Sequence, residues 1–158
     1  GYNYGAGAYS RVRAGVRFPT SVTLCYSLVV WGMTLLLPRF LIQIFNSDAE
    51  LVAAGIPAFR IYFATFFCMA FQMAGQTTFV ALGRSKNAVF FSLLRKAIIV
   101  APLILWLPTV AGLVVDGVFL AEPISNVIGG LACWLTMYFV VYRPLGLLPD
   151  TPPGGQPA

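Results

Sequence analysis

Four long apolar stretches divide this 158-residue chain, and they constrain its fold more than any other feature. A helix that crosses a membrane needs about 20 consecutive, mostly apolar residues. The stretches that reach this length are Pro19–Phe45, Ile56–Leu82, Val89–Leu113 and Val118–Tyr142. They are unbroken and lack the alternation of polar and apolar residues that marks a strand of a membrane barrel. The sequence therefore predicts an all-α integral membrane protein with four transmembrane helices.

Composition supports this class and excludes others. Hydrophobic residues make up 59% of the chain and charged residues 9%, whereas soluble domains carry about 25% charged residues. The net charge of +5 does not indicate a nucleic-acid partner, because the basic residues lie between apolar runs and share no amphipathic face. Since the three cysteines stand singly and histidine is absent, no metal site is expected. The predicted surroundings are the lipid bilayer.

The charges in the predicted connections orient the helices. One side is expected to hold eight of the ten basic residues: Arg11, Arg13, Arg17, Arg84, Lys86, Arg95, Lys96 and Arg143. The other side carries Asp48, Glu50 and Asp116 against the single Arg39. Because basic connections stay in the cytoplasm, the first side is predicted to be cytoplasmic. With four spans, both ends of the chain would then lie there.

The two ends of the chain differ from its middle. Residues 1–18 are rich in glycine and carry three arginines, which predicts a cytoplasmic connection that follows a helix missing from this chain. Residues 19–143 form the predicted transmembrane region. Residues 144–158 are rich in proline and glycine and predict a disordered cytoplasmic tail.

Three motifs together resemble one family of transporters. The opening "GYNYGA" is similar to the end of the eighth helix of multidrug and toxic compound extrusion (MATE) transporters. The stretch "FQMAGQTTFVALGRSKNA" resembles their tenth helix and the basic turn after it. The stretch "DGVFLAEPISNVIGG" resembles the start of the twelfth helix in the bacterial MepA-like branch. The motifs follow one another in the family's order and spacing, and the resemblance covers about residues 1–145.

The resemblance implies a parent of about twelve helices in two six-helix lobes, around a cavity that opens alternately to each side. This chain would be a C-terminal fragment: helices nine to twelve and the end of the eighth. The missing N-terminal lobe and seventh helix would be its partners. The implied function is secondary active multidrug efflux from the bacterial inner membrane. Amphipathic cationic drugs would leave in antiport with Na⁺ or H⁺, with no enzymatic activity and no cofactor beyond the coupling ion.

One helical face of the second span carries the predicted substrate-binding residues. Met69, Gln72, Met73 and Gln76 are spaced i, i+3, i+4 and i+7, which aligns them on a helix. Glutamine offers a donor and an acceptor without charge, and methionine adapts to varied ligands. Two interpretations are open, namely the lining of a drug cavity and a hydrogen bond between helices with methionine as filler.

Glu122 and Asn126 are the predicted cation-binding or gating residues of the fourth span. Glu122 precedes Pro123, so one interpretation is a helix start with a carboxylate beside the helix dipole. The other is a protonatable or cation-attracting group at the outer mouth. Asn126, one turn further, is expected to hydrogen-bond Glu122 or a neighbouring helix.

Other functions remain as alternatives. A lipid-linked precursor flippase of the same superfamily would need a strongly cationic cavity, and only Arg39 and Arg60 are expected near the membrane interior. A non-transporting accessory subunit would be a closed bundle with its own start methionine. A metal-dependent membrane enzyme would need clustered acids, but Asp116 and Glu122 do not share a helical face.

Overall fold

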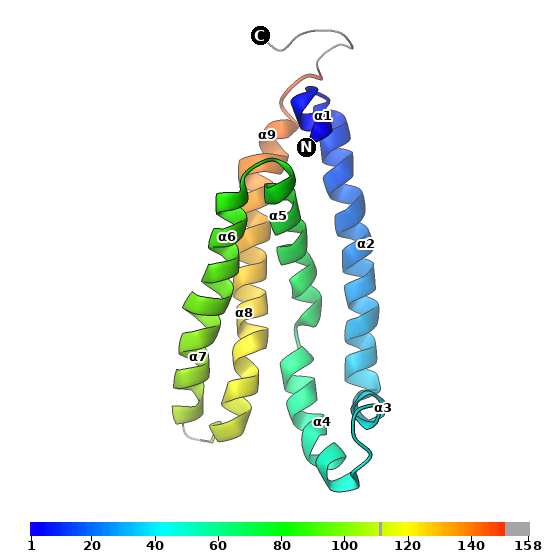
Figure 1. Cartoon of the computed structure of the whole chain (residues 1–158), viewed down its shortest axis with the longest axis vertical. Helices are drawn as coiled ribbons and strands as arrows, with labels where there is room; N and C mark the ends of the chain where they lie inside the picture. The colour runs from blue at the N-terminus through cyan, green and yellow to red at the C-terminus, as the bar shows by residue number, and fades with distance from the viewer. Residues whose placement is uncertain (111, 151–158) are drawn as a thin grey trace.

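The computed structural model describes residues 1–110 and 112–150, and these form four long helical rods side by side (Figure 1). Helices long and apolar enough to cross a membrane run through Tyr9–Leu36, Ala49–Ala81, Ser85–Thr109 and Val114–Leu145. Within the described ranges the chain contains no strand. The predicted all-α fold with four membrane-length helices is confirmed.

The first rod starts earlier than the sequence suggests. A short helix α1 (Tyr2–Gly5) leads into α2 (Tyr9–Leu36), which includes Pro19 and most of the predicted connection 1–18. Leu37 leaves helical geometry, with φ −121° and ψ 39°, before α3 (Pro38–Gln43) begins at a proline. The residue before a proline avoids the helical region, which explains the break.

The second rod consists of two helices in line. Helix α4 (Ala49–Phe63) begins at Asp48, whose Oδ1 accepts hydrogen bonds from the backbone N–H groups of Glu50 and Leu51 at 2.9 and 3.2 Å. A single 3₁₀ turn, η1 (Phe66–Cys68), joins it to α5 (Met69–Ala81). At this joint the Thr65 hydroxyl donates to the carbonyl of Pro123 in the fourth rod at 2.9 Å.

The third and fourth rods each contain a π-helical segment. The third consists of α6 (Ser85–Leu93), the π-helical η2 (Leu94–Val100), α7 (Ala101–Trp106) and the 3₁₀ turn η3 (Leu107–Thr109). The fourth consists of α8 (Val114–Met137), the π-helical η4 (Tyr138–Tyr142) and α9 (Arg143–Leu145). Of the predicted tail 144–158, residues 151–158 lie outside the described ranges.

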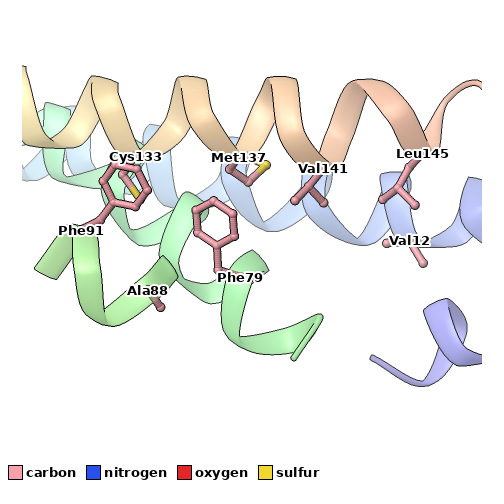
Figure 2. Packing of buried hydrophobic residues seen from close by; sticks show 8 residues of the cluster. All are labelled: Val12, Phe79, Ala88, Phe91, Cys133, Met137, Val141 and Leu145. Atoms are coloured by element: carbon pink, nitrogen blue, oxygen red, sulfur yellow. The ribbon is translucent and has the colours of Figure 1, made fainter. Parts of the chain in front are cut away.

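Helix α8 is the centre of the packing, because it contacts α4, α5, η2 and α7. Its buried side chains Cys133 and Met137 lie against Phe79 of α5 and Phe91 of α6 (Figure 2). The whole buried cluster comprises Val12, Phe79, Ala88, Phe91, Cys133, Met137, Val141 and Leu145. Small residues let α5 and α8 approach closely, as is common between membrane helices.

Both termini lie at the same end of the molecule as the turn between α5 and α6 (Figure 1). At this end Asp150 closes the segment, since its carboxylate accepts from the backbone N–H of Ser10 at 2.8 Å and from the Ser10 hydroxyl. The Arg13 guanidinium lies 4.8 Å from the centre of the Tyr142 ring. The start of α2 is therefore held against the end of the fourth rod.

Candidate functional site

A buried group of charged side chains joins the third and fourth rods. The Glu122 carboxylate of α8 accepts from the Lys96 ammonium at 3.0 Å (Oε1) and 3.1 Å (Oε2). It also lies 3.3 Å from Nη1 of Arg95. The same Arg95 nitrogen donates to Oδ1 of Asn126. We call these four residues, Arg95, Lys96, Glu122 and Asn126, the charged cluster.

The position of Arg95 and Lys96 corrects the sequence prediction. They were expected at the cytoplasmic connection, but they follow Ser85, the start of the third rod, by 10 and 11 residues. At 1.5 Å per residue this is about 15 Å, near the middle of a hydrocarbon core about 30 Å thick. Six basic residues remain at the predicted cytoplasmic end, so the charge asymmetry survives with a smaller count.

The π-helical winding of η2 explains how two consecutive side chains reach one carboxylate. Neighbouring residues of an α-helix point about 100° apart. The wider i→i+5 turn reduces that angle, and such turns occur frequently at functional sites. Arg95 and Lys96 lie in the first turn of η2 (Leu94–Val100) and both contact Glu122.

The interpretation of Glu122 as a helix start is wrong. Helix α8 begins at Val114, so Glu122 and Pro123 lie inside it. Asn126 bonds a neighbouring rod through Arg95, one of the two outcomes expected for it. One turn further, a Cβ added to Gly129 would lie 3.0–3.3 Å from the carbons of the Arg95 side chain. The stripe Glu122, Asn126 and Gly129 thus provides both the partners and the space for Arg95.

The charged cluster is polar but unevenly exposed. The Arg95 side chain is 9% exposed and that of Glu122 11%, whereas the Lys96 side chain is 54% exposed. The buried Nε of Arg95 has no hydrogen-bond partner within the described residues. Two cationic groups therefore share a single carboxylate, and one of them reaches the surface of the bundle.

The structure separates the four residues predicted to bind substrate. Gln72 is buried beside α8, where a Cβ on Gly130 would lie 4.0 Å from its own Cβ. Nε2 of Gln76 donates to the Ala88 carbonyl of α6 at 3.2 Å. Met73 is 50% exposed on another side of α5, and Met69 is half-buried at the start of that helix. For Gln76 the observed contact is thus the hydrogen bond between helices.

Met73 lines a hollow of about 380 Å³ between α2 and α5, at the end that holds the termini. Its walls combine small and apolar residues with hydroxyl groups and one cation. The residues are Gly1, Asn3, Arg11, Val12, Gly15, Val16, Pro19, Thr20, Thr23, Met73, Ala74, Thr77, Thr78, Ala81 and Leu82. Sequence analysis missed the contribution of α2, because its threonines show no spacing that distinguishes them from ordinary membrane-helix residues.

Comparison with known proteins gives one family and two solved structures. The MatE family model matches residues 1–106, more than half of the chain. A solved structure of a drug-transporter complex, described as that of the MATE multidrug transporter DinF-BH, aligns with a TM-score of 0.82 at 33% identity. A second, described as protein A, gives a TM-score of 0.81 at 34% identity. Each alignment covers 94% of this chain and 32% of the other. No curated protein matches significantly.

Proposed function

Because this chain belongs to the MatE family of multidrug efflux transporters, we propose that the whole protein exports amphipathic cationic compounds in antiport with Na⁺ or H⁺. The observation that carries the proposal is the alignment of 94% of the chain with a MATE multidrug transporter. The chain spans about a third of that relative's length, so transport would involve segments beyond these four helices. Alternating access between two lobes is the proposed mechanism. No enzymatic activity is proposed.

The hollow between α2 and α5 is the proposed place of drug contact in this segment. Met73 offers it a flexible thioether, which adapts to ligands of different shape. The hydroxyls of Thr77 and Thr78 turn back onto carbonyls of α5, so the wall presents a largely apolar surface. Met69, Gln72 and Gln76 remain proposed substrate residues, and Gln72 and Gln76 would act from behind this wall, on the side of α6 and α8.

Glu122 and Asn126 are proposed as gating residues rather than as the site of the coupling ion. The Glu122 carboxylate is occupied by Lys96 and Arg95, so a free cation would have to displace one of them. Separating these partners would release the third rod from the fourth. A rearrangement of this kind suits alternating access.

The proposed location is the bacterial inner membrane, with both ends of this segment in the cytoplasm. The end that holds the termini also carries Arg84 and Lys86 at the turn between α5 and α6. Single cysteines introduced at positions 48 and 86 test this orientation with an impermeant thiol reagent. Position 48 should react from the periplasm and position 86 only from the cytoplasm; the reverse pattern would contradict it.

A lipid-linked precursor flippase is the second candidate. Two basic side chains, Arg95 and Lys96, lie at membrane depth, so the argument that the interior is poor in cations no longer stands. The family match favours drug export. Proteoliposomes that contain the whole encoded protein separate the two: export predicts ion flux that depends on a cationic drug, whereas a flippase predicts movement of a lipid-linked pyrophosphate without it.

The Met73→Ala variant refines the transport test. It shortens one wall of the hollow and should change the order of preference among drugs at a normal protein level. Met33→Ala, on an exposed part of α2 outside the hollow, is the matched control. Absence of drug-dependent ion flux in the unaltered protein would overturn the proposed function.

A further inference from the structure

We propose that the Lys96 end of the charged cluster binds one small anionic group, either a halide or the carboxylate of a bound compound. Nothing in the family match assigns a role to Arg95 or Lys96. The proposal rests on the charge of the cluster, the exposure of Lys96 and the unused donors of both basic side chains. It concerns binding, so it does not depend on the proposed export of cations.

The charges of the cluster do not balance. Arg95 and Lys96 carry two positive charges, and Glu122 supplies one negative charge. All five acidic residues of the chain lie within the described ranges, and the other four stand at helix ends or beyond them: Asp48, Glu50, Asp116 and Asp150. Tyr62 of α4, a neutral group at physiological pH, is the other titratable side chain whose electrostatic neighbours include Glu122 and Arg95. An uncompensated charge at membrane depth is costly, and one further negative charge would neutralise the cluster.

Lys96 is the member of the cluster that a ligand can reach. Its side chain is 54% exposed at the surface of the four-helix segment, although it lies near mid-membrane depth. Charged side chains at such depth face a water-filled space or protein rather than lipid. A ligand entering that space meets Lys96 first and Glu122 and Arg95 behind it.

The donors fit an acceptor with a single charge. A lysine ammonium has three N–H groups, and the contacts of Lys96 are the two oxygens of one carboxylate. The buried Arg95 side chain keeps an Nε donor without a partner among the described residues. Because the surplus is one positive charge, a monovalent halide or carboxylate matches it better than a divalent anion.

Binding of chloride to the whole encoded protein, purified in detergent, tests the proposal directly. The linewidth of the chloride NMR signal broadens when the ion exchanges with a protein site. We expect broadening that saturates with chloride and is reversed by benzoate, a monocarboxylate. Lys96→Gln should weaken chloride binding about tenfold or more, as expected for the loss of a charged hydrogen-bond partner. Lys96→Arg, which keeps the charge, should retain saturable binding.

Lys86→Gln is the matched control, because it removes a lysine from the start of the same rod outside the cluster. It should leave the chloride response unchanged. Absence of saturable broadening would overturn the proposal and indicate that a carboxylate elsewhere in the protein neutralises Lys96. Equal effects of Lys96→Gln and Lys86→Gln would also overturn it. Failure of benzoate to compete would overturn the carboxylate part of the assignment.

Discussion

Two adjacent glycines of α8 test how tightly the rods pack, because a methyl group would meet backbone at one and a side chain at the other. A Cβ on Gly130 would lie 2.7 Å from the carbonyl oxygen of Cys68. A Cβ on Gly129 would lie 3.0 Å from Cγ of Arg95. The perturbation is the same in both variants, Gly130→Ala and Gly129→Ala, and the helix is the same.

The distances set the expected magnitudes. To reach an ordinary contact of 3.4 Å, the backbone of Cys68 would have to move by 3.4 − 2.7 = 0.7 Å. Overpacking of this kind costs about 1–3 kcal/mol, and replacing glycine by alanine in a helix returns up to about 1 kcal/mol. Because backbone cannot rotate away, we expect Gly130→Ala to destabilise the protein by about 2 kcal/mol. The flexible Arg95 stem can shift by a few tenths of an ångström, so Gly129→Ala should stay within about 1 kcal/mol of the unaltered protein.

Reversible unfolding of the whole encoded protein in mixed detergent micelles measures both free energies of unfolding. The result that supports the packing is a loss for Gly130→Ala that clearly exceeds the loss for Gly129→Ala. Equal losses, or a larger loss for Gly129→Ala, would refute the reasoning that the α5–α8 approach at Cys68 is the tighter one.

Three further predictions concern individual polar contacts. Glu122→Gln should lower the free energy of unfolding by about 3 kcal/mol, the low end for breaking a buried ion pair; its control Lys96→Gln should cost about 1 kcal/mol or less, because Lys96 is half exposed, and equal losses would contradict this. Gln76→Leu should cost about 0.6 kcal/mol and leave the ranking of exported drugs unchanged, so altered selectivity at a normal protein level would count against a packing role. Hydrogen bonds from the Ser10 hydroxyl and N–H hold the pKa of Asp150 below its ordinary value of about 3.9. The contact is therefore complete above that value and is lost as the pH falls through the lower folded-state pKa, so spin labels beside Ser10 and Asp150 should separate only below about pH 4, and separation near pH 6 would contradict it.

The helices were predictable because length and hydropathy alone determine a membrane span. Their boundaries were less so. Helix α2 starts at Tyr9 rather than Pro19, since arginines and small residues at its beginning allow helix, although their composition is that of a connection. Helix α8 starts before Glu122 because the valines and Gly117 ahead of it pack against the end of the third rod.

The charged cluster was missed because Arg95 and Lys96 were grouped with Arg84 and Lys86 along the sequence. A signal was present, since both residues fall inside the predicted span Val89–Leu113. An ionisable residue within a span requires a partner, and Glu122 was the acid available inside another span. The pairing itself depends on how α8 and η2 face each other, which periodicity along one helix does not reveal.

The predicted substrate face illustrates a different limit. Spacing correctly aligned Met69, Gln72, Met73 and Gln76 along α5, but a stripe on a central helix meets more than one neighbour. Gln76 bonds α6, Gln72 lies toward α8, and Met73 lies toward α2. A helical wheel shows which residues share a side, whereas the direction of each neighbour comes from the packing of the whole segment.

The π-helical segment Leu94–Val100 has a consequence for how this region tolerates insertion and deletion. A π turn accommodates one residue more than an α turn over the same axial length. Deleting one residue among positions 97–99 would therefore let the segment rewind as α-helix, with α6 and α7 keeping their orientation. A deletion of one residue within α8 would instead rotate everything beyond it by about 100°. Length variation of a single residue is thus expected in η2 and not in α8, and the variants that lose it would present Arg95 and Lys96 in diverging directions.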